Sequence, residues 1–404
     1  MSAVAQVHLA TDAEPAGPLR QGLRLTSIDL LRGLIIVLMV LDHVRDYFMA
    51  GAFFTDPVDP RTSWPALYAT RWITHLCAPG FVFLAGVSAF LKGVRDDDTR
   101  SLSWFLFSRG LWLILLELTV INVGWNFALG APFLQVIWAI GAGMILLSAL
   151  VWLGPRAVLA IGVAIVAGHN LLAPINPPHL GEYGIVWNLA LEPGFPQLLG
   201  SPMFVAYPLL PWLGIMCLGY GLGHVFLVTP GERIRTLLFL GLTFVAAFAL
   251  LRWLNVYGDP GPWTAQSDPV RTAMSVMNVQ KYPPSLQFIL VTLGISLLLL
   301  AAFERLRGPV AEFFLTYGRV PLFVYVLHIY LIHGLQLLVG TMVAGRPASD
   351  FVLVFANPAK QEGWGYGLGV VYLVWAVVLA LLFPLARWFG RVKRERRDWW
   401  LSYL

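Results

Sequence analysis

The chain has 404 residues, of which 58% are hydrophobic and only 12% are charged, with a formal net charge of +5. A soluble domain has about 25% charged residues, so the charge here is too sparse to cover a water-soluble body of this size. The composition therefore excludes a soluble globular enzyme, and the basic residues beside apolar runs give no indication of nucleic-acid binding. Because those runs are about 20 residues long, enough to cross a hydrocarbon core of about 30 Å, we predict an all-α, polytopic membrane helix bundle.

The first predicted element is a flexible cytoplasmic tail over residues 1–26, which hold no apolar run and do not form a cleavable signal peptide. Ten apolar runs follow, and each predicts one transmembrane helix. These runs lie near residues 27–49, 72–93, 102–122, 133–154, 156–173, 202–227, 234–254, 285–303, 318–341 and 367–389. We expect them to form one transmembrane domain over residues 27–390, followed by a basic cytoplasmic tail over residues 391–404.

The distribution of Lys and Arg predicts the orientation. Alternate connections counted from the N-terminus hold sixteen of these residues on one side and seven on the other. Since basic residues favour the cytoplasmic side, both termini are expected to be cytoplasmic. The long connections 50–71, 174–201, 255–284 and 342–366 then lie outside, where a recognition surface is expected.

The first predicted helix carries an unusual number of ionisable side chains. They are Asp29, Arg32, Asp42, His43, Arg45 and Asp46. At 100° per residue, Arg32 and His43 share one face with Asp29 and Asp46, and about 16 Å separates Arg32 from His43 along the axis. Ionisable groups inside a membrane usually mark a functional path. The alternative interpretation is that Asp29–Arg32 and Asp42–Arg45 are neutralising i, i+3 pairs and that His43 is a core histidine.

Other predicted spans hold further candidates. His75 precedes Pro79 and Gly80, which are expected to open the second helix and line a cavity. His328 lies one turn after Tyr325 and is expected to reach the same cavity, whereas His333 points away. Arg109 and Glu117 on the third predicted helix, together with the core histidines His169 and His224, have structural interpretations.

Several kinds of chemistry have no matching motif. The two cysteines, Cys77 and Cys217, both lie in apolar runs, so neither a disulfide framework nor a Cys-based metal site is expected. No HExxH, GxSxG, Walker or GxGxxG motif is present, and we expect no metal.

Several separated segments together resemble one family of membrane enzymes. They are Arg24 to Phe48, Pro79 to Gly86, Tyr207 to Gly214, Lys281 to Ser285, Gly318 to Phe323 with His328 and His333, and Asp398 to Leu404. The chain resembles the heparan-alpha-glucosaminide N-acetyltransferase family, especially its bacterial members. Arg32 and His43, with ten residues between them, also resemble the pattern of the acyltransferase family three membrane enzymes, in which the histidine is catalytic. In the lysosomal member of the heparan-alpha-glucosaminide N-acetyltransferase family, the proposed active histidine lies in the first lumenal loop. The corresponding connection of this chain, residues 50–71, contains no histidine.

This resemblance implies a bacterial inner-membrane enzyme that moves an acetyl or other acyl group from cytoplasmic acyl-CoA to an extracytoplasmic sugar or glycoconjugate acceptor. His43 is the expected base, adjusted by Asp46 or Asp42, and it acts either directly or through an acyl-histidine. Asp46, His75 and His328 are the other catalytic candidates.

The co-substrate, acetyl-CoA or another acyl-CoA, has its own candidate residues. These are Asp29, Arg32 and Arg109, with Lys92 and Arg95 as further candidates for its phosphates. The outer aromatic residues Trp64, Trp125, Trp187, Trp263 and Tyr282 are candidates for a sugar surface. The bilayer is the expected surrounding, and a homo-oligomer is compatible with the sequence. A transporter or flippase that uses the charged helix as a pathway is the alternative function.

Overall fold

The computed structural model of the protein describes residues 25–128, 130, 132–172, 184–198, 201–396, 398 and 401. Most of the predicted tail of residues 1–26, residues 173–183 of one outer connection, and part of the basic C-terminal tail lie outside the described residues.

Helices make up nearly all of the regular structure. The α-helices are α1 Thr26–Phe48, α2 Pro65–Ile73, α3 Cys77–Asp96, α4 Thr99–Leu116, α5 Asn122–Asn126, α6 Val136–Leu150, α7 Pro155–Gly168, α8 Gly184–Ala190, α9 Leu209–Gly221, α10 Pro230–Leu254, α11 Pro269–Met277, α12 Leu286–Phe303, α13 Pro309–Gly318, α14 Pro321–Met342 and α15 Leu368–Glu395. The 3-10 segments are η1 Thr74–Leu76, η3 Val151–Leu153, η4 His169–Leu172, η6 Leu222–Phe226, η7 Ala348–Phe351 and η8 Pro358–Gln361, and the π-helical turn is η2 Glu117–Ile121.

Within the described residues, four two-residue strands lie between the helices. They are β1 Phe133–Leu134, β2 Gln197–Leu198, β3 Ser201–Pro202 and β4 Phe204–Val205. β1 pairs with β4 in parallel, and β2 pairs with β3 in antiparallel orientation. The pairing of β1 with β4 joins the segment before α6 to the segment before α9.

Nine helical segments within the described part of the chain are long and apolar enough to cross a membrane, and each coincides with a predicted span. The predicted all-α polytopic membrane fold is therefore confirmed. The first predicted span, residues 27–49, forms α1, which is not among the nine. The charge of α1 explains the difference, because its five Asp and Arg residues make it too polar to be identified as a lipid-facing span.

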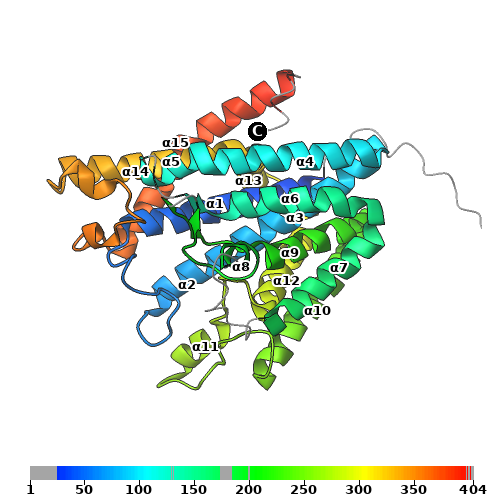
Figure 1. Cartoon of the computed structure of the whole chain (residues 1–404), viewed down its shortest axis with the longest axis horizontal. Coiled ribbons are helices and arrows are strands. Elements are labelled where there is room, and N and C mark those ends of the chain that lie inside the picture. The colour runs from blue at the N-terminus through cyan, green and yellow to red at the C-terminus, as the bar shows by residue number, and fades with distance from the viewer. Residues whose placement is uncertain are drawn as a thin grey trace, which may run out of the picture.

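The charged helix α1 lies at the centre of the bundle. It packs against α3, α12, α13, α14 and α15, and most of its 23 residues are buried. The helices α10 and α15, in contrast, leave most of their apolar residues uncovered by protein, as expected for helices that face lipid. Figure 1 shows α1, α4 and α6 extending along the long axis of the molecule.

Two glycines allow the backbones of α1 and α13 to approach each other closely where these helices cross. A Cβ atom on Gly33 would lie 1.9 Å from the carbonyl oxygen of Phe314, and one on Gly318 would lie 1.8 Å from that of Asp29. Small residues let helix backbones approach closely in membranes. This contact brings Arg319, which follows α13, next to the N-terminal half of α1.

The second predicted span differs from the expectation. The helix is interrupted at η1, before Cys77, and not at Pro79 and Gly80, which lie inside α3. Pro79 is tolerated there because it lies in the first turn of α3, where backbone N–H groups have no partner within the helix.

Candidate active site

Two histidines from distant parts of the chain form the centre of the site. Nδ1 of His43 on α1 lies 2.7 Å from Nε2 of His328 on α14. Nδ1 of His328 lies 3.0 Å from the carbonyl oxygen of Val324. Because a carbonyl only accepts, this Nδ1 carries the proton and Nε2 of His328 accepts from His43. A neutral His43 therefore holds its lone pair on Nε2, which makes that nitrogen the basic atom of the pair.

Accessibility distinguishes the two rings. His328 is fully buried, with 0% of its surface exposed, whereas His43 is only half-buried. The indole of Trp125 packs edge-on against His43, with the ring centroids 4.7 Å apart. His43 is thus the member of the pair that a substrate can reach, and His328 is placed to orient it.

A network of ion pairs surrounds the C-terminal end of α1. Nη1 of Arg71 on α2 contacts both carboxylate oxygens of Asp42, at 2.6 and 2.5 Å. Arg45 bonds Asp42 at 3.2 Å and Asp46 at 2.6 Å. The i, i+3 pair Asp42–Arg45 is therefore present, and Asp46 is bonded to Arg45. The hydrogen-bond partner of the His43 ring is His328, whereas the sequence favoured Asp46 or Asp42.

A cavity of about 410 Å³ lies beside the other half of α1. Asp29 and Arg32 line it, and they form the predicted i, i+3 pair at 3.0 Å. Arg32 also donates to Oγ of Ser88, at 2.5 Å. Six basic side chains line this cavity: Arg32, Lys92, Arg95, Arg109, Arg319 and Lys393. Among the described lining residues Asp29 is the one acidic side chain, so basic side chains predominate, although Lys92 and Arg95 also pair with Asp96 outside the lining.

The cavity runs from an accessible mouth towards the histidine pair. The side chain of Arg95 at the mouth is 66% exposed, whereas Tyr325 at the inner end is only 3% exposed. The ring of Tyr325 lies 5.5 Å from that of His328, edge to face. On α1, Ile36 is the lining residue nearest to His43, seven residues or about 10 Å before it.

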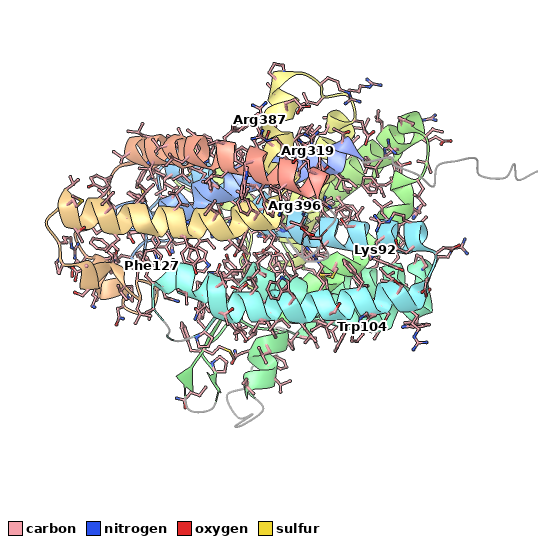
Figure 2. All side chains as sticks on the ribbon, turned by 90° about the horizontal axis from the view of Figure 1, so that it is seen from above. Lys92, Trp104, Phe127, Arg319, Arg387 and Arg396 are labelled. Atoms are coloured by element: carbon pink, nitrogen blue, oxygen red, sulfur yellow. The ribbon has the colours of Figure 1, made fainter. Side chains whose placement is uncertain are left out.

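The lining of the cavity comes from helices that are far apart in sequence. α3 contributes Lys92, and Arg319 follows α13. Figure 2 shows both residues well away from Phe127, which lies towards one end of the bundle. Phe127 stacks on His333, with the ring centroids 3.7 Å apart. The basic cavity and the His333 region thus lie in different parts of the bundle.

The remaining candidates take separate positions. His75 is buried beside Trp72 and Phe288 and makes no hydrogen bond to the histidine pair. His333 lies between the carbonyl oxygens of Gly124 and Phe351, as a residue that joins helices. Among the described residues, no group of three His, Cys, Asp or Glu side chains is arranged to hold a metal ion.

Two further residues have roles that the sequence did not indicate. Glu117 accepts a hydrogen bond from the backbone N–H of Trp138 at 2.9 Å, so this carboxylate caps α6 and has a backbone partner. Trp125, expected in an outer loop, is buried in α5 against His43. An aromatic residue near a predicted helix end is equally compatible with either position, which explains the difference.

Comparison with known proteins identifies the family of the chain. A family model described as heparan-alpha-glucosaminide N-acetyltransferase, catalytic, matches residues 24–257, more than half of the chain. No curated protein matches the chain at a significant level. The matched region includes His43, Arg71 and four of the six basic cavity residues, whereas His328 lies beyond it.

Proposed function

Because the chain belongs to the heparan-alpha-glucosaminide N-acetyltransferase family and is a membrane acetyltransferase, we propose that it acylates an extracytoplasmic sugar or glycoconjugate with an acetyl or similar group from cytoplasmic acyl-CoA. The bacterial inner membrane is the proposed location. The observation that carries this proposal is the basic cavity, which runs along α1 towards the His43–His328 pair.

The donor is proposed to enter by its thioester end. The phosphates of CoA remain at the mouth, where Arg95, Lys92 and Arg319 supply charge-assisted hydrogen bonds. The pantetheine arm then extends past Ile36 towards Tyr325. Because this inner end is buried, water is largely excluded from the thioester, which limits hydrolysis.

The acceptor is proposed to approach His43 from the other end of α1. Its hydroxyl or amine attacks the thioester carbonyl carbon while Nε2 of His43 takes the proton. The C–S bond breaks, the acyl group forms an ester or amide with the acceptor, and the proton passes to the CoA thiolate. His328 keeps the His43 ring in the tautomer that this step needs.

A two-step route through an acyl-histidine uses the same nitrogen. In that route Nε2 of His43 attacks the thioester first, and the acceptor then takes the acyl group from the ring. Mass spectrometry of protein quenched after incubation with acetyl-CoA alone separates the two routes. An acetyl group on His43 supports the two-step route, and unmodified protein supports direct transfer.

The decisive experiment uses purified full chain in proteoliposomes made from native membrane lipids, which supply membrane-bound acceptors. Radiolabelled acetyl-CoA is added, and CoA release and labelled acceptor are measured. We expect both in wild-type protein and neither in His43→Ala. Substrate flux across the membrane without thioester consumption would instead support the transporter alternative.

Arg32 provides a test of the donor path. We expect Arg32→Ala to weaken acetyl-CoA binding more than it slows the bound reaction, because Arg32 lines the cavity about 16 Å from His43. A fall in the turnover number alone would place Arg32 in the chemistry.

A further inference from the structure

The inner end of the basic cavity holds a hydroxyl group without a hydrogen-bond partner. Tyr325 on α14 lines the cavity and is only 3% exposed. Its hydroxyl oxygen is buried and forms no hydrogen bond within the described part of the chain. Buried polar groups are nearly always hydrogen-bonded in folded proteins. This hydroxyl therefore lacks a partner at the place where the proposed donor path ends.

The other hydroxyl of the described lining is already bonded. Ser88 donates to the carbonyl oxygen of Leu84, and it also accepts from Arg32. Ile36 and Ile140, which line the cavity from α1 and α6, have apolar side chains. Among the described lining residues, Tyr325 is thus the uncharged side chain that is able to donate a hydrogen bond to a ligand.

Tyr325 borders both the cavity and the histidine pair. Its ring lies 5.5 Å from that of His328, edge to face, and the His328 ring lies 4.9 Å from that of His43. Tyr325 and His328 are three residues apart on α14, so the same helix turn holds both side chains in place. A thioester that reaches the end of the cavity therefore meets this hydroxyl close to the base.

Trp125 connects the two ends of this arrangement. Its ring centroid lies 4.7 Å from that of His43, and its indole N–H approaches the hydroxyl of Tyr325 without forming a hydrogen bond. An indole N–H only donates, so it leaves the proton of Tyr325 without an acceptor. The partner that this site lacks is therefore an acceptor, and a carbonyl oxygen is one.

We propose that Tyr325 is a further catalytic residue, whose O–H group donates a hydrogen bond to the carbonyl oxygen of the bound thioester. This inference rests on the proposed function, because it adds a residue to the same reaction. Donors that are already aimed at the developing oxyanion stabilise the transition state of acyl transfer more than the ground state, since they need no reorganisation during the reaction.

The step balances without a further reactant. When the acceptor oxygen or nitrogen bonds to the carbonyl carbon, the π electrons of the carbonyl move to its oxygen, and His43 takes the acceptor proton. Tyr325 stabilises the resulting oxyanion and keeps its own proton. The carbonyl then forms again, the C–S bond breaks, and the thiolate takes the proton from His43.

The first test removes only the hydroxyl. In proteoliposomes with radiolabelled acetyl-CoA, Tyr325→Phe is expected to lower kcat about 10²- to 10³-fold with little change in KM, because the lost interaction acts mainly in the transition state. Tyr220→Phe is the matched control, since Tyr220 on α9 is similarly buried at 5% exposure and does not line the cavity. Thermal melting checks the folding of both variants. A wild-type kcat in Tyr325→Phe, or equal losses in the two variants, would overturn the proposal.

A second test reads the hydrogen bond directly and needs no turnover. The probe is the ketone analogue of acetyl-CoA in which a methylene group replaces the sulfur, labelled with ¹³C at the carbonyl carbon. Isotope-edited infrared difference spectra of the bound probe report the carbonyl stretch, which a donated hydrogen bond moves to lower wavenumber. We expect a lower wavenumber in wild-type protein and in Tyr220→Phe than in Tyr325→Phe, a difference that a purely structural role of Tyr325 does not produce.

The wild-type spectrum alone also tests the proposal if Tyr325→Phe does not fold. A bound carbonyl stretch at or above its value in an apolar solvent would show that no donor reaches the carbonyl, and it would overturn the assignment. A stretch well below that value supports it.

The same samples separate this inference from the proposed function. If wild-type protein neither binds the ketone probe nor releases CoA from acetyl-CoA, the proposed function fails and the role of Tyr325 fails with it. If wild-type protein does both, while Tyr325→Phe keeps the wild-type kcat and carbonyl stretch, only the role of Tyr325 is overturned.

Discussion

Replacing His328 by Phe is expected to slow acyl transfer strongly while leaving donor binding nearly unchanged. The substitution removes the acceptor of the 2.7 Å hydrogen bond from Nδ1 of His43. Leaving such a donor unsatisfied costs about 1–3 kcal/mol, which corresponds to roughly five- to 150-fold in rate if the cost falls on the reactive geometry. The Michaelis constant for acetyl-CoA should change little, because the side chain that lines the cavity on this helix is Tyr325, one turn away.

The assay follows release of the CoA thiol in proteoliposomes, with kcat and KM measured separately. His328→Gln serves as the conservative variant, because its amide oxygen is able to accept the same hydrogen bond, and it should recover part of the lost rate. Thermal melting of each variant controls for folding. Wild-type kcat in the Phe variant, or an equal loss in the Phe and Gln variants with unchanged melting, would refute the positioning role of His328.

Three further predictions concern the base, the donor cavity and the orientation. His43→Ala should lower kcat by about 10²- to 10⁴-fold with little change in melting temperature, and retained activity would transfer the role of base to another group. Arg319→Ala should raise the KM for acetyl-CoA with little change in kcat, because this side chain lines the cavity and its ion pair with Glu312 is long, at 3.7 Å. Arg307→Ala is the matched control, and an equal rise of KM in both variants would argue against phosphate binding by Arg319. With both termini cytoplasmic, Ser267→Cys should react with an impermeant maleimide in intact cells and Arg307→Cys should not, whereas the reverse pattern would invert the orientation.

The fold class was predictable because hydropathy acts locally. Each apolar run of about 20 residues forms a helix, since no other structure satisfies the backbone of a single segment in lipid. Helix α1 shows where this rule is limited. Its charges are incompatible with lipid contact, but the other helices cover it, and that protection depends on the tertiary structure.

The candidate site was predictable only in part. Periodicity placed Asp29, Arg32 and His43 on one helix, and the structure finds them there. The partner of His43 lies 285 residues away along the chain, and Arg71 reaches Asp42 from α2. A single sequence offers no signal for such pairings, because they follow from how the helices pack. Arg319 and Lys393 were missed as cavity residues for the same reason, since basic residues at inner helix ends ordinarily report only orientation.

The contact of α13 with α1 has a consequence for engineering this protein. Only Arg319 and Val320 separate α13 from α14, so a side chain larger than hydrogen at position 33 or 318 would displace α13 and, with it, the start of α14. The width of the basic cavity and the alignment of the His43–His328 pair are therefore not independently adjustable from this side. Redesign towards larger acyl groups is better directed at Ala85 and Leu106. These residues line the cavity from α3 and α4 and do not belong to the connected helices α13 and α14.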